Sequence, residues 1–511
     1  MLNRRRVLVV LSAAVLVAAS AAGAAIAPIK EYAVGIAAGY QTERLLSVGD
    51  TVPETSSPTQ QYKMVGIPDG LGAHGNPDGT KTVFMNHELP SATLSEPNVG
   101  RPLNRGALVS KYILDAQGNV LSGERAYDWI FNENSFVGPA PEVGNATRPF
   151  SRFCSGSLAG PEHGFDRHIY LTNEEEGTPA NSFDGKGGLT VAIVDNNLYA
   201  LPKFGRFAWE NTLIQPTQGD QTVAMSMEDG PAVLDPAAEN SQVYMYVGRK
   251  DRSPGASVLR RNGLDNGQLY VLVPADKGSN PDEAAFRSGR ISVEWELIPD
   301  AGQLDEAQLE AASDAAGAFR FARPEDGAFN LRNHAQFVFV TTGGAAGANE
   351  LGRLYSLTLN PFSPVGRGSL QVEYNADHVV RRGGDIAISP DNIDISEKYL
   401  MIQEDGTAES RVVMAAKRRD GSIWRLNISN RGPNVSTAER IVELDPPGRD
   451  GTPVGPGIWE TSGIIDASAL YGEGTWLFDV QAHPPTAAPA PNTVEDGQLL
   501  LLTGSLGPGG T

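Results

Sequence analysis

Short runs of β-forming residues recur along almost the whole of this 511-residue chain. Turns rich in Gly, Asp and Asn separate the runs, a pattern typical of a sandwich, a barrel or a propeller. The runs are Thr82–Asn86, His168–Asn173, Leu189–Val194, Thr222–Ser226, Gln242–Val247, Gln268–Val273, Gln336–Thr342, Arg353–Leu359, Lys398–Gln403, Ser422–Ile428, Thr475–Val480 and Gln498–Leu502. They are too many for one small sandwich, and no shift in composition marks a domain boundary. We therefore expect an all-β fold, a β-propeller with loop and short-helix insertions, including a helix at Asp305–Ala316.

The first residues have the composition of an export signal. Arg4–Arg6 precede the apolar and small-residue stretch Val7–Ala25, and Ala25-Ile26-Ala27 forms an A-x-A cleavage pattern. The arginines fit both twin-arginine export and ordinary secretion. A membrane anchor fits less well, because the stretch is rich in Ala and short of the roughly 20 strongly apolar residues that a span needs. No later stretch reaches that length. We predict a signal peptide, one decorated propeller domain and a flexible tail, over residues 1–27, 28–505 and 506–511.

The charge balance limits the partners of the chain. It carries 41 Lys and Arg against 61 Asp and Glu, a formal net charge of −20. Nucleic acids and anionic membrane surfaces need clustered basic residues, so we expect no nucleic-acid groove. An excess of acidic residues fits a protein that binds cations. Cys154 is the only cysteine, so neither an intramolecular disulfide nor a zinc site made of several cysteines can form.

Four of the β-runs end in acidic residues, at His87-Glu88, Glu174–Glu176, Glu228-Asp229 and Glu404-Asp405. Turn chemistry explains a single case, because acidic residues followed by Gly are common where a strand ends. In a propeller, however, strand ends converge on one mouth of the central channel, so carboxylates from several blades would meet there. Carboxylates that close together stay ionised only with cations between them. The pattern predicts a site for hard cations such as Ca²⁺, Mg²⁺ or Fe³⁺.

Cys154 lies in a turn of small residues shortly before the run Glu174–Glu176. A free thiol in an exported protein oxidises unless it is buried or used. Two interpretations stay open, namely an inert buried side chain and a thiolate bound to a transition metal. The second interpretation predicts a centre with mixed metals, because thiolates and carboxylates prefer different ions.

An ordered set of motifs spans about residues 80–485. It consists of Asn86-His87-Glu88, Cys154-Ser155-Gly156, Leu171-Thr172-Asn173-Glu174-Glu175, Gly205-Arg206-Phe207-Ala208-Trp209-Glu210, Glu228-Asp229, Arg323-Pro324-Glu325, Pro390-Asp391-Asn392-Ile393, Glu404-Asp405-Gly406 and Val480-Gln481-Ala482-His483-Pro484. In this order the motifs resemble those of the PhoX-type bacterial alkaline phosphatases, and ordered agreement is more specific than any single motif. The resemblance implies an exported six-bladed propeller, a phosphoric monoester hydrolase whose channel holds Fe³⁺ and Ca²⁺ ions bridged by an oxo group.

The resemblance also implies the residues of the site. Cys154 matches the thiolate ligand of iron, and Arg323 matches the arginine that faces the phosphate. The carboxylates that match ligands of iron and calcium are Glu88, Glu175, Glu210, Asp229 and Glu325, with Glu174 and Glu176 as alternatives to Glu175. We expect Arg323 and Glu325 to take part in catalysis. Trp209 and Asn173 stand where the family commonly has His and Cys, which indicates a divergent member.

Neighbouring residues have simpler interpretations. Without the resemblance, Arg323 fits a structural salt bridge with Glu325 as well as it fits a phosphate contact. For His87 we expect a hydrogen bond that orients Glu88, and for His483 a structural role.

Three functions stay open from the sequence. The first is an exported, metal-dependent phosphatase, periplasmic or extracellular and monomeric, that acts on small phosphorylated substrates. The second is a calcium-dependent ester or lactone hydrolase, against which Cys154 weighs because oxygen cages for calcium gain nothing from a thiolate. The third is a non-catalytic calcium-binding propeller, in which Cys154→Ser would leave the metal content and the stability nearly unchanged.

Overall fold

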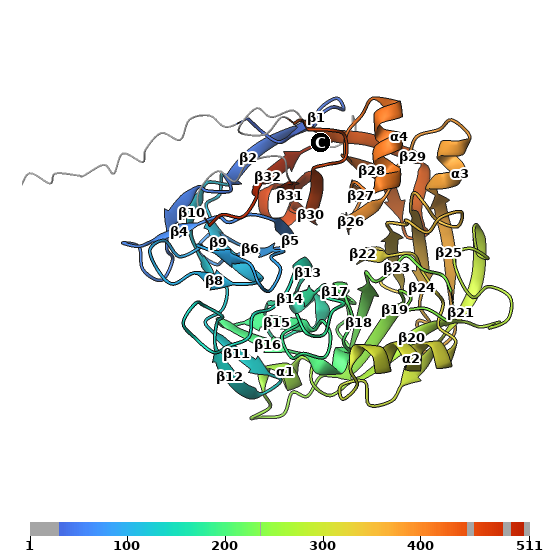
Figure 1. Ribbon diagram of the computed structural model, residues 1–511, viewed down its shortest axis with the longest axis horizontal. Coiled ribbons are helices and arrows are strands. Elements are labelled where there is room, and N and C mark those ends of the chain that lie inside the picture. The colour runs from blue at the N-terminus through green and yellow to red at the C-terminus, as the bar shows by residue number, and fades with distance from the viewer. Residues whose placement is uncertain (1–29, 236, 447–453, 484–491, 505–511) are drawn as a thin grey trace, which may run out of the picture. The chain divides into compact units, whose positions relative to one another are not determined.

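The computed structural model describes residues 30–235, 237–446, 454–483 and 492–504. The predicted signal peptide and the predicted C-terminal tail lie outside the described residues. Six β-sheets or half-sheets, here called blades 1 to 6, surround a common centre within the unit Glu31–Thr511 (Figure 1). Every strand run expected from the sequence is a strand of one of these blades.

The first three blades follow one another along the chain. Blade 1 consists, from the centre outward, of β5 (Pro68–Gly75), β6 (Lys81–His87), β9 (Leu108–Leu114) and β10 (Val120–Arg125). Blade 2 consists of β13 (Phe153–Ala159), β14 (Ile169–Glu174), β15 (Thr190–Val194) and β16 (Asn197–Ala200), extended by β11 (Trp129–Asn132) and β12 (Ser135–Pro139). Blade 3 consists of β17 (Trp209–Ile214), β18 (Gln221–Glu228), β19 (Val243–Arg249) and β20 (Gln268–Pro274).

The other three blades complete the ring. Blade 4 consists of β22 (Pro324–Phe329), β23 (Gln336–Thr341), β24 (Arg353–Thr358) and β25 (Gly368–Asn375), and β21 (Gly289–Ile298) joins it to blade 3 as a nine-stranded sheet. Blade 5 consists of β26 (Pro390–Ile395), β27 (Tyr399–Glu404), β28 (Ser422–Ser429), β29 (Gly432–Leu444) and β1 (Ala33–Gly35). Blade 6 consists of β30 (Glu460–Asp466), β31 (Thr475–Ala482), β32 (Asp496–Thr503) and β2 (Gln41–Ser47).

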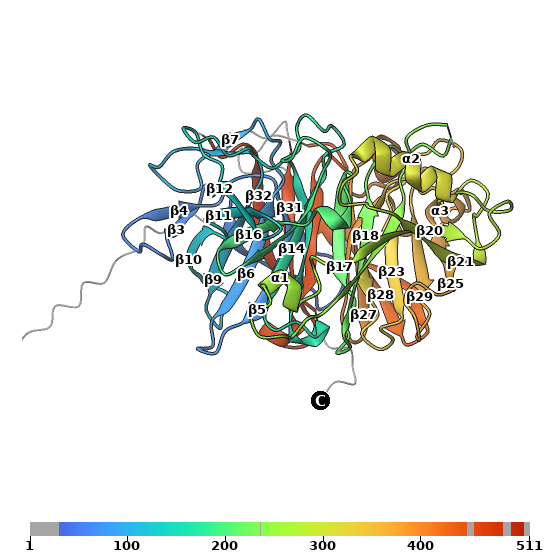
Figure 2. The same cartoon turned by 90° about the horizontal axis from the view of Figure 1, so that it is seen from below.

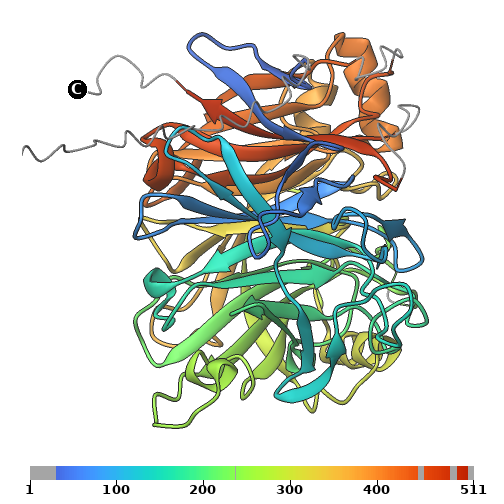
Figure 3. The same cartoon turned by 90° about the vertical axis from the view of Figure 1, so that its left-hand side faces the viewer.

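The ring closes with strands from both ends of the chain. Strand β2 pairs with β32, and β1 pairs with β29, so N-terminal strands complete the two C-terminal blades (Figure 3). The innermost strands contact one another in ring order, β5, β13, β17, β22, β26, β30 and again β5. This arrangement confirms the expected propeller with six blades. Closure of the ring packs blade 6 against blade 1, so neither end of the array leaves an apolar blade face uncovered.

The helices and the small sheets are additions to this ring. The helices are α1 (Val258–Arg261), α2 (Glu306–Ala316), α3 (Ala376–Arg381), α4 (Ala408–Lys417) and α5 (Ser468–Tyr471). The two-stranded sheets pair β3 (Thr51–Pro53) with β4 (Gln61–Lys63) and β7 (Leu94–Ser95) with β8 (Asn104–Arg105). Helix α2 lies at one edge of the ring in Figure 2 and confirms the helix expected from the sequence. Asp305 caps α2, because its side chain accepts the backbone N–H of Gln308.

The hydrophobic core is divided among the interfaces between neighbouring blades. Strand β23 shows how the sequence achieves this. Phe337 and Phe339 belong to the cluster shared with blade 3, whereas Val338 and Val340 belong to the cluster shared with blade 5. Because successive side chains of a strand point to opposite faces, a strand between two blades must be apolar on both. This requirement explains why the strand runs are continuously apolar rather than alternating.

Among the described residues, no helix is both long and apolar enough to cross a membrane.

Candidate active site

A repeated irregularity of the innermost strands places side chains in the centre of the ring. Each of the six inner strands shifts register against its neighbour near its first residues. A β-bulge of this kind bends the strand and turns a side chain that would otherwise face the next blade. In the first five blades, the residue at or beside the bulge is acidic or a thiol, namely Asp69, Cys154, Glu210, Glu325 and Asp391.

The second strand of each blade contributes a residue just beyond its end. In the first five blades the backbone N–H of this residue donates to the carbonyl of the residue before the inner strand, and in four of these blades the donor residue is acidic. The four pairs with an acidic donor are Glu88 with Ile67 (2.9 Å), Glu175 with Arg152 (2.9 Å), Asp229 with Ala208 (2.9 Å) and Asp405 with Ser389 (3.0 Å). These are the four acidic strand ends that the sequence singled out, and all four line one cavity.

That cavity, of about 240 Å³, also brings together every site residue expected from the sequence. Its walls include Glu88, Cys154, Glu175, Glu210, Asp229, Arg323 and Glu325. The remaining wall residues are Arg152, Asp391, Asp405, Glu460, Gln481 and His483. Of these, only Asp405, as an acidic strand end, was expected in the channel from the sequence. Part of this set carries a sequence signal. Pro68-Asp69, Pro324-Glu325 and Pro390-Asp391 all begin inner strands with Pro followed by an acid.

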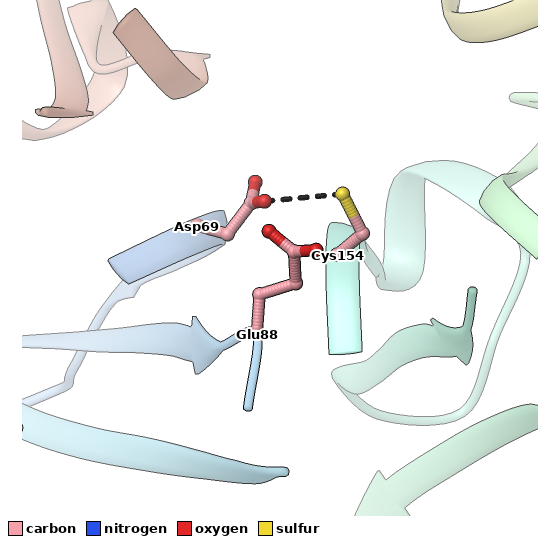
Figure 4. A group of neighbouring side chains, drawn as sticks. All are labelled: Asp69, Glu88 and Cys154. Carbon is pink, nitrogen blue, oxygen red and sulfur yellow. Dashed lines mark hydrogen bonds between the residues drawn. The ribbon is translucent and has the colours of Figure 1, made fainter. Parts of the chain in front are cut away.

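Three overlapping groups of side chains have the spacing of metal ligands. Within each group the ligand atoms lie within 4.8 Å of one another. The first group is Asp69, Glu88 and Cys154, the second is Cys154, Glu175 and Glu210, and the third is Glu210, Asp229 and Glu325. Figure 4 shows the first group, in which the thiol of Cys154 donates to Oδ2 of Asp69 at 3.1 Å. Because Cys154 and Glu210 each belong to two groups, the three groups form one continuous set of donors. A thiolate among carboxylates fits a mixed set of soft and hard cations.

Of the three consecutive glutamates, the middle one faces the cavity. Oε1 of Glu174 accepts the backbone N–H groups of Ser151 and Phe183, at 3.0 and 2.9 Å. Glu176 accepts the hydroxyl of Ser151 and the backbone N–H of Thr178. Glu175 instead lies against Arg152 and lines the cavity.

The carboxylates of the site are crowded and buried. Burial raises the pKa of Glu210 well above its usual range, and the neighbouring Glu325 and Glu175 raise it further. Burial and neighbouring carboxylates raise the pKa values of Asp69 and Asp391 in the same way. Burial also raises the pKa of the Cys154 thiol. Acidic groups in this situation are either protonated or neutralised by cations, so their arrangement fits bound metal ions.

Hydrogen bonds between side chains of different blades hold the inner end of the site. The Ser155 hydroxyl donates to Oε1 of Glu210 at 2.5 Å and accepts a hydrogen bond from Nδ2 of Asn392 at 2.6 Å. Ser462 donates to Oδ1 of Asp69 at 2.6 Å and to Oδ1 of Asn392 at 2.8 Å. These buried contacts join blades 1, 2, 3, 5 and 6, so they fix the ligand groups relative to one another.

One of the two histidines differs from expectation. His87 does not orient Glu88, because its ring nitrogens lie against the carbonyl of Gly66 and the hydroxyl of Ser110. The physical reason is the alternation of β6, which places His87 in the blade and the next residue in the channel. His483 lines the cavity. Burial lowers the pKa of His483, but hydrogen bonds to Glu460 and Glu495 outweigh burial and raise it to about 11.

Comparisons with known proteins agree with this geometry. A family model described as alkaline phosphatase PhoX matches residues 196–448. This part of the chain is similar to the PhoX family. The matched residues include Glu210, Asp229, Arg323, Glu325 and Asp405, which all line the cavity. The match confirms the resemblance seen in the sequence and the enzyme class, a phosphoric monoester hydrolase of the alkaline phosphatase type.

A solved structure shares the fold at low sequence identity. The structure of Pseudomonas fluorescens PhoX in complex with vanadate, a transition state analogue, has a TM-score of 0.62 and 16% identity, and the match covers 94% of this chain and 97% of that one. Two further structures are less similar. A luciferin-regenerating enzyme has a TM-score of 0.33 and 10% identity, and the match covers 87% of this chain and 93% of that one. An α-L-arabinofuranosidase from Fusarium graminearum has a TM-score of 0.42 and 10% identity, and the match covers 90% of this chain and 97% of that one. No curated protein sequence matches the chain.

Two positions at which the sequence indicated divergence from PhoX do not line the cavity. Trp209 is buried against Phe207 and Tyr244. Asn173 is buried, and its Oδ1 accepts the hydroxyl of Thr212. Both side chains pack behind the site, so the walls of the cavity do not contain the differences.

Proposed function

We propose that this protein is an exported, metal-dependent phosphatase that hydrolyses small phosphomonoesters at a centre of iron and calcium ions in the propeller channel. The observation that supports the proposal most directly is the cavity itself. One thiol and eight carboxylate side chains line it, together with two arginines and one histidine. A set of donors with such an excess of acidic groups holds a phosphate dianion only when cations offset the charge.

We assign ligand roles from the groups described above. Cys154 supplies the thiolate for iron, and the carboxylates that hold iron and calcium are Glu88, Glu175, Glu210, Asp229 and Glu325. Asp69 and the thiol of Cys154 are already in contact, so Asp69 is an additional oxygen donor beside the iron position. When bound, the metal ions supply Lewis-acid stabilisation of phosphate oxygens and lower the pKa of an attacking water.

Arg323 has the geometry of a phosphate-binding residue. Its Nε and Nη2 donate to the two oxygens of Asp229 at 2.8 and 2.9 Å, and Nη2 lies 3.2 Å from Oε1 of Glu325. These contacts fix the plane of the guanidinium at the wall of the cavity. The group therefore meets the equatorial oxygens of a phosphate without first being ordered. Glu325 contributes to catalysis by holding Arg323 as well as by binding metal.

The proposal extends to location and assembly. Residues 1–27 direct export, residues 28–505 form the mature domain, and the protein acts as a monomer in the periplasm or outside the cell.

Hydrolysis of a chromogenic aryl phosphate by the purified mature protein, before and after chelation, tests the proposed function. We expect hydrolysis that chelation abolishes and that iron together with calcium restores. An aryl acetate and a lactone serve as parallel substrates. Turnover of these carbonyl esters without turnover of the phosphate would favour a calcium-dependent ester or lactone hydrolase. No turnover of any substrate by the metal-loaded protein would favour a non-catalytic calcium-binding propeller.

A further inference from the structure

Arg152 occupies in blade 2 the position that Arg323 occupies in blade 4. Each is the residue directly before its inner strand, and each has a left-handed backbone, with φ of 48° and 56°. The backbone carbonyl of each accepts the N–H of the residue after the second strand, Glu175 for Arg152 and Thr342 for Arg323, at 2.9 Å in both cases. The two arginines are thus equivalent under the repeat of the propeller. Left-handed backbone at this position is a feature of the repeat, because Ile67 and Ser389, which precede the inner strands of blades 1 and 5, have φ of 51° and 44°. The arginine side chains distinguish blades 2 and 4 from these two blades.

The ion pairs of the two arginines are also similar. Arg152 donates from Nε to Oε1 of Glu88 at 2.9 Å and from Nη2 to both oxygens of Glu175 at 2.5 Å. Arg323 also bridges two carboxylates, but its Nε and Nη2 both donate to Asp229, and Nη2 lies 3.2 Å from Oε1 of Glu325. Each guanidinium therefore spans two carboxylates of the proposed metal centre, and the two arginines engage different carboxylates.

The exposed fractions place both guanidinium groups on the solvent side of these carboxylates. The Arg152 side chain is 42% exposed and that of Arg323 is 28% exposed, whereas Glu175, Asp229 and Glu325 are 7%, 8% and 3% exposed. An anion that enters the cavity from solvent meets the arginines before it reaches the buried acids.

Each guanidinium also keeps donors for such an anion. Within the described part of the chain, Nη1 of Arg152 and Nη1 of Arg323 make no hydrogen bond, while Nε and Nη2 are engaged with carboxylates. The ion pairs hold the planes of both groups, and Nη1 remains available to donate hydrogen bonds to an anionic ligand.

We propose that Arg152 is a second phosphate-binding residue, which grips the substrate together with Arg323 and makes the site selective for dianionic phosphomonoesters over monoanionic diesters. This inference rests on the proposed phosphatase function. A phosphomonoester dianion carries a second negative charge that a diester lacks, and two fixed guanidinium groups offset it. The loss of one arginine therefore weakens the binding of a monoester more than the binding of a diester.

A purely structural role for Arg152 gives different results. If it only held Glu88 and Glu175, its removal would change the metal content or the melting temperature, and the fully loaded protein would bind phosphate as before. Binding therefore has to be measured on protein of verified metal content.

The experiment compares wild-type protein with Arg152→Gln, Arg152→Lys and the control Arg167→Gln. Arg167 lies in the same blade, pairs with Asp166 and Asp195 on the surface and does not line the cavity. Each metal-loaded protein is titrated calorimetrically with inorganic phosphate, and its metal content is determined. Then kcat/KM is measured for an aryl phosphate and for a diester of the same phenol.

We expect Arg152→Gln to weaken phosphate binding by about 10- to 100-fold with unchanged metal content, in line with the loss of charge-assisted hydrogen bonds. We expect kcat/KM of this variant to fall more for the monoester than for the diester. The phosphate affinity of Arg152→Lys should lie between those of wild type and Arg152→Gln. The phosphate affinity and kcat/KM of Arg167→Gln should match those of wild type. Unchanged phosphate binding by loaded Arg152→Gln, or equal losses for both esters, would overturn the inference while leaving the phosphatase in place. If wild-type protein neither bound phosphate nor hydrolysed the ester, the proposed function would fall first and the inference with it.

Discussion

Cys154 is the residue whose chemistry separates the candidate functions. Its thiol is buried, contacts Asp69 at 3.1 Å and belongs to two of the three ligand groups. We predict that Cys154→Ser loses iron and phosphatase activity but folds, because Ser is close to Cys in size and Asp69 can accept its hydroxyl. Elemental analysis with an aryl phosphatase assay checks this prediction. A variant that kept both iron and activity would show that the thiol is inert.

The run Glu174–Glu176 gives a matched pair of variants. We predict that Glu175→Gln lowers metal content and lowers kcat by about 100-fold or more, since it removes a charged ligand of the centre. Glu176→Gln is the control, because Glu176 makes its hydrogen bonds with Ser151 and Thr178 outside the ligand groups. Metal analysis and steady-state kinetics of both variants supply the comparison. Equal effects would mean that the position of Glu175 in the cavity does not determine its role.

At the residue scale, the sequence predicted the acidic side chains of the site better than the basic ones. The strand-end pattern identified Glu88, Asp229 and their counterparts, because an acid after an apolar run is visible locally. Arg152 and His483 were not identified as site residues, since what makes them so is contact with acids from elsewhere in the chain. Arg152 meets Glu88 across 64 positions of sequence. Spacing along one strand carries no information about such a contact.

Outside the sheets, the sequence predicted helix α2 from its content of Ala, Leu, Glu and Asp, and a capping box fixes where the helix begins. The side chain of Asp305 accepts the N–H of Gln308, and the Gln308 side chain accepts the N–H of Asp305, which together form a capping box. We predict that Asp305→Ala lowers the free energy of unfolding by about 1 kcal/mol, whereas Asp305→Asn, an equally good cap, leaves it nearly unchanged. Urea unfolding of the metal-loaded protein measures both. An equal loss of unfolding free energy in the two variants would show that the charge of Asp305, and not its capping hydrogen bond, stabilises the helix.

Other elements were harder to predict from the sequence. Helix α4 begins after Thr407, whose side chain accepts the N–H of Ser410. The capping residue Thr407 directly follows Glu404-Asp405-Gly406. The sequence pattern there indicates a strand end and a turn, so it does not predict the helix. The bulges of the inner strands have no signal in apolar periodicity at all, because they change pairing without changing composition. They nevertheless decide which side chains reach the channel.

At the scale of the whole molecule, the stability of the metal-free protein is expected to depend on pH. Burial and neighbouring carboxylates raise the pKa of Glu210 and Glu325, and burial with Glu460 raises that of Asp405 to about 6. Groups with a raised pKa in the folded state bind protons more tightly there. They therefore contribute stability that is complete below about pH 4, the ordinary range of carboxyl groups, and is lost as pH rises through the raised values.

We predict from this sign that chelated protein melts at a lower temperature at pH 8 than at pH 6. Loaded protein should show a smaller difference, because cations keep the carboxylates ionised and bind only the folded state. Thermal melts of both forms in the two buffers measure the effect. Equal pH dependence with and without metal would indicate that the carboxylates do not face bound cations.

The sequence predicted the ring of blades because apolar runs of regular length are a property of every blade. It could not show how the ring closes or which acids come together, because both depend on contacts between chain ends and between distant blades. The pairing of β2 with β32 and the hydrogen bond from Ser462 to Asp69 are of this kind.

The central claim is that one thiol and acids from several blades hold iron and calcium in the channel. Anomalous diffraction at the iron absorption edge, from crystals of the mature protein loaded with both metals, measures this most directly. The account predicts an iron peak within bonding distance of Sγ of Cys154 and calcium positions among Glu210, Asp229 and Glu325. A thiol that stayed hydrogen-bonded to Asp69, with no iron beside it, would contradict the account.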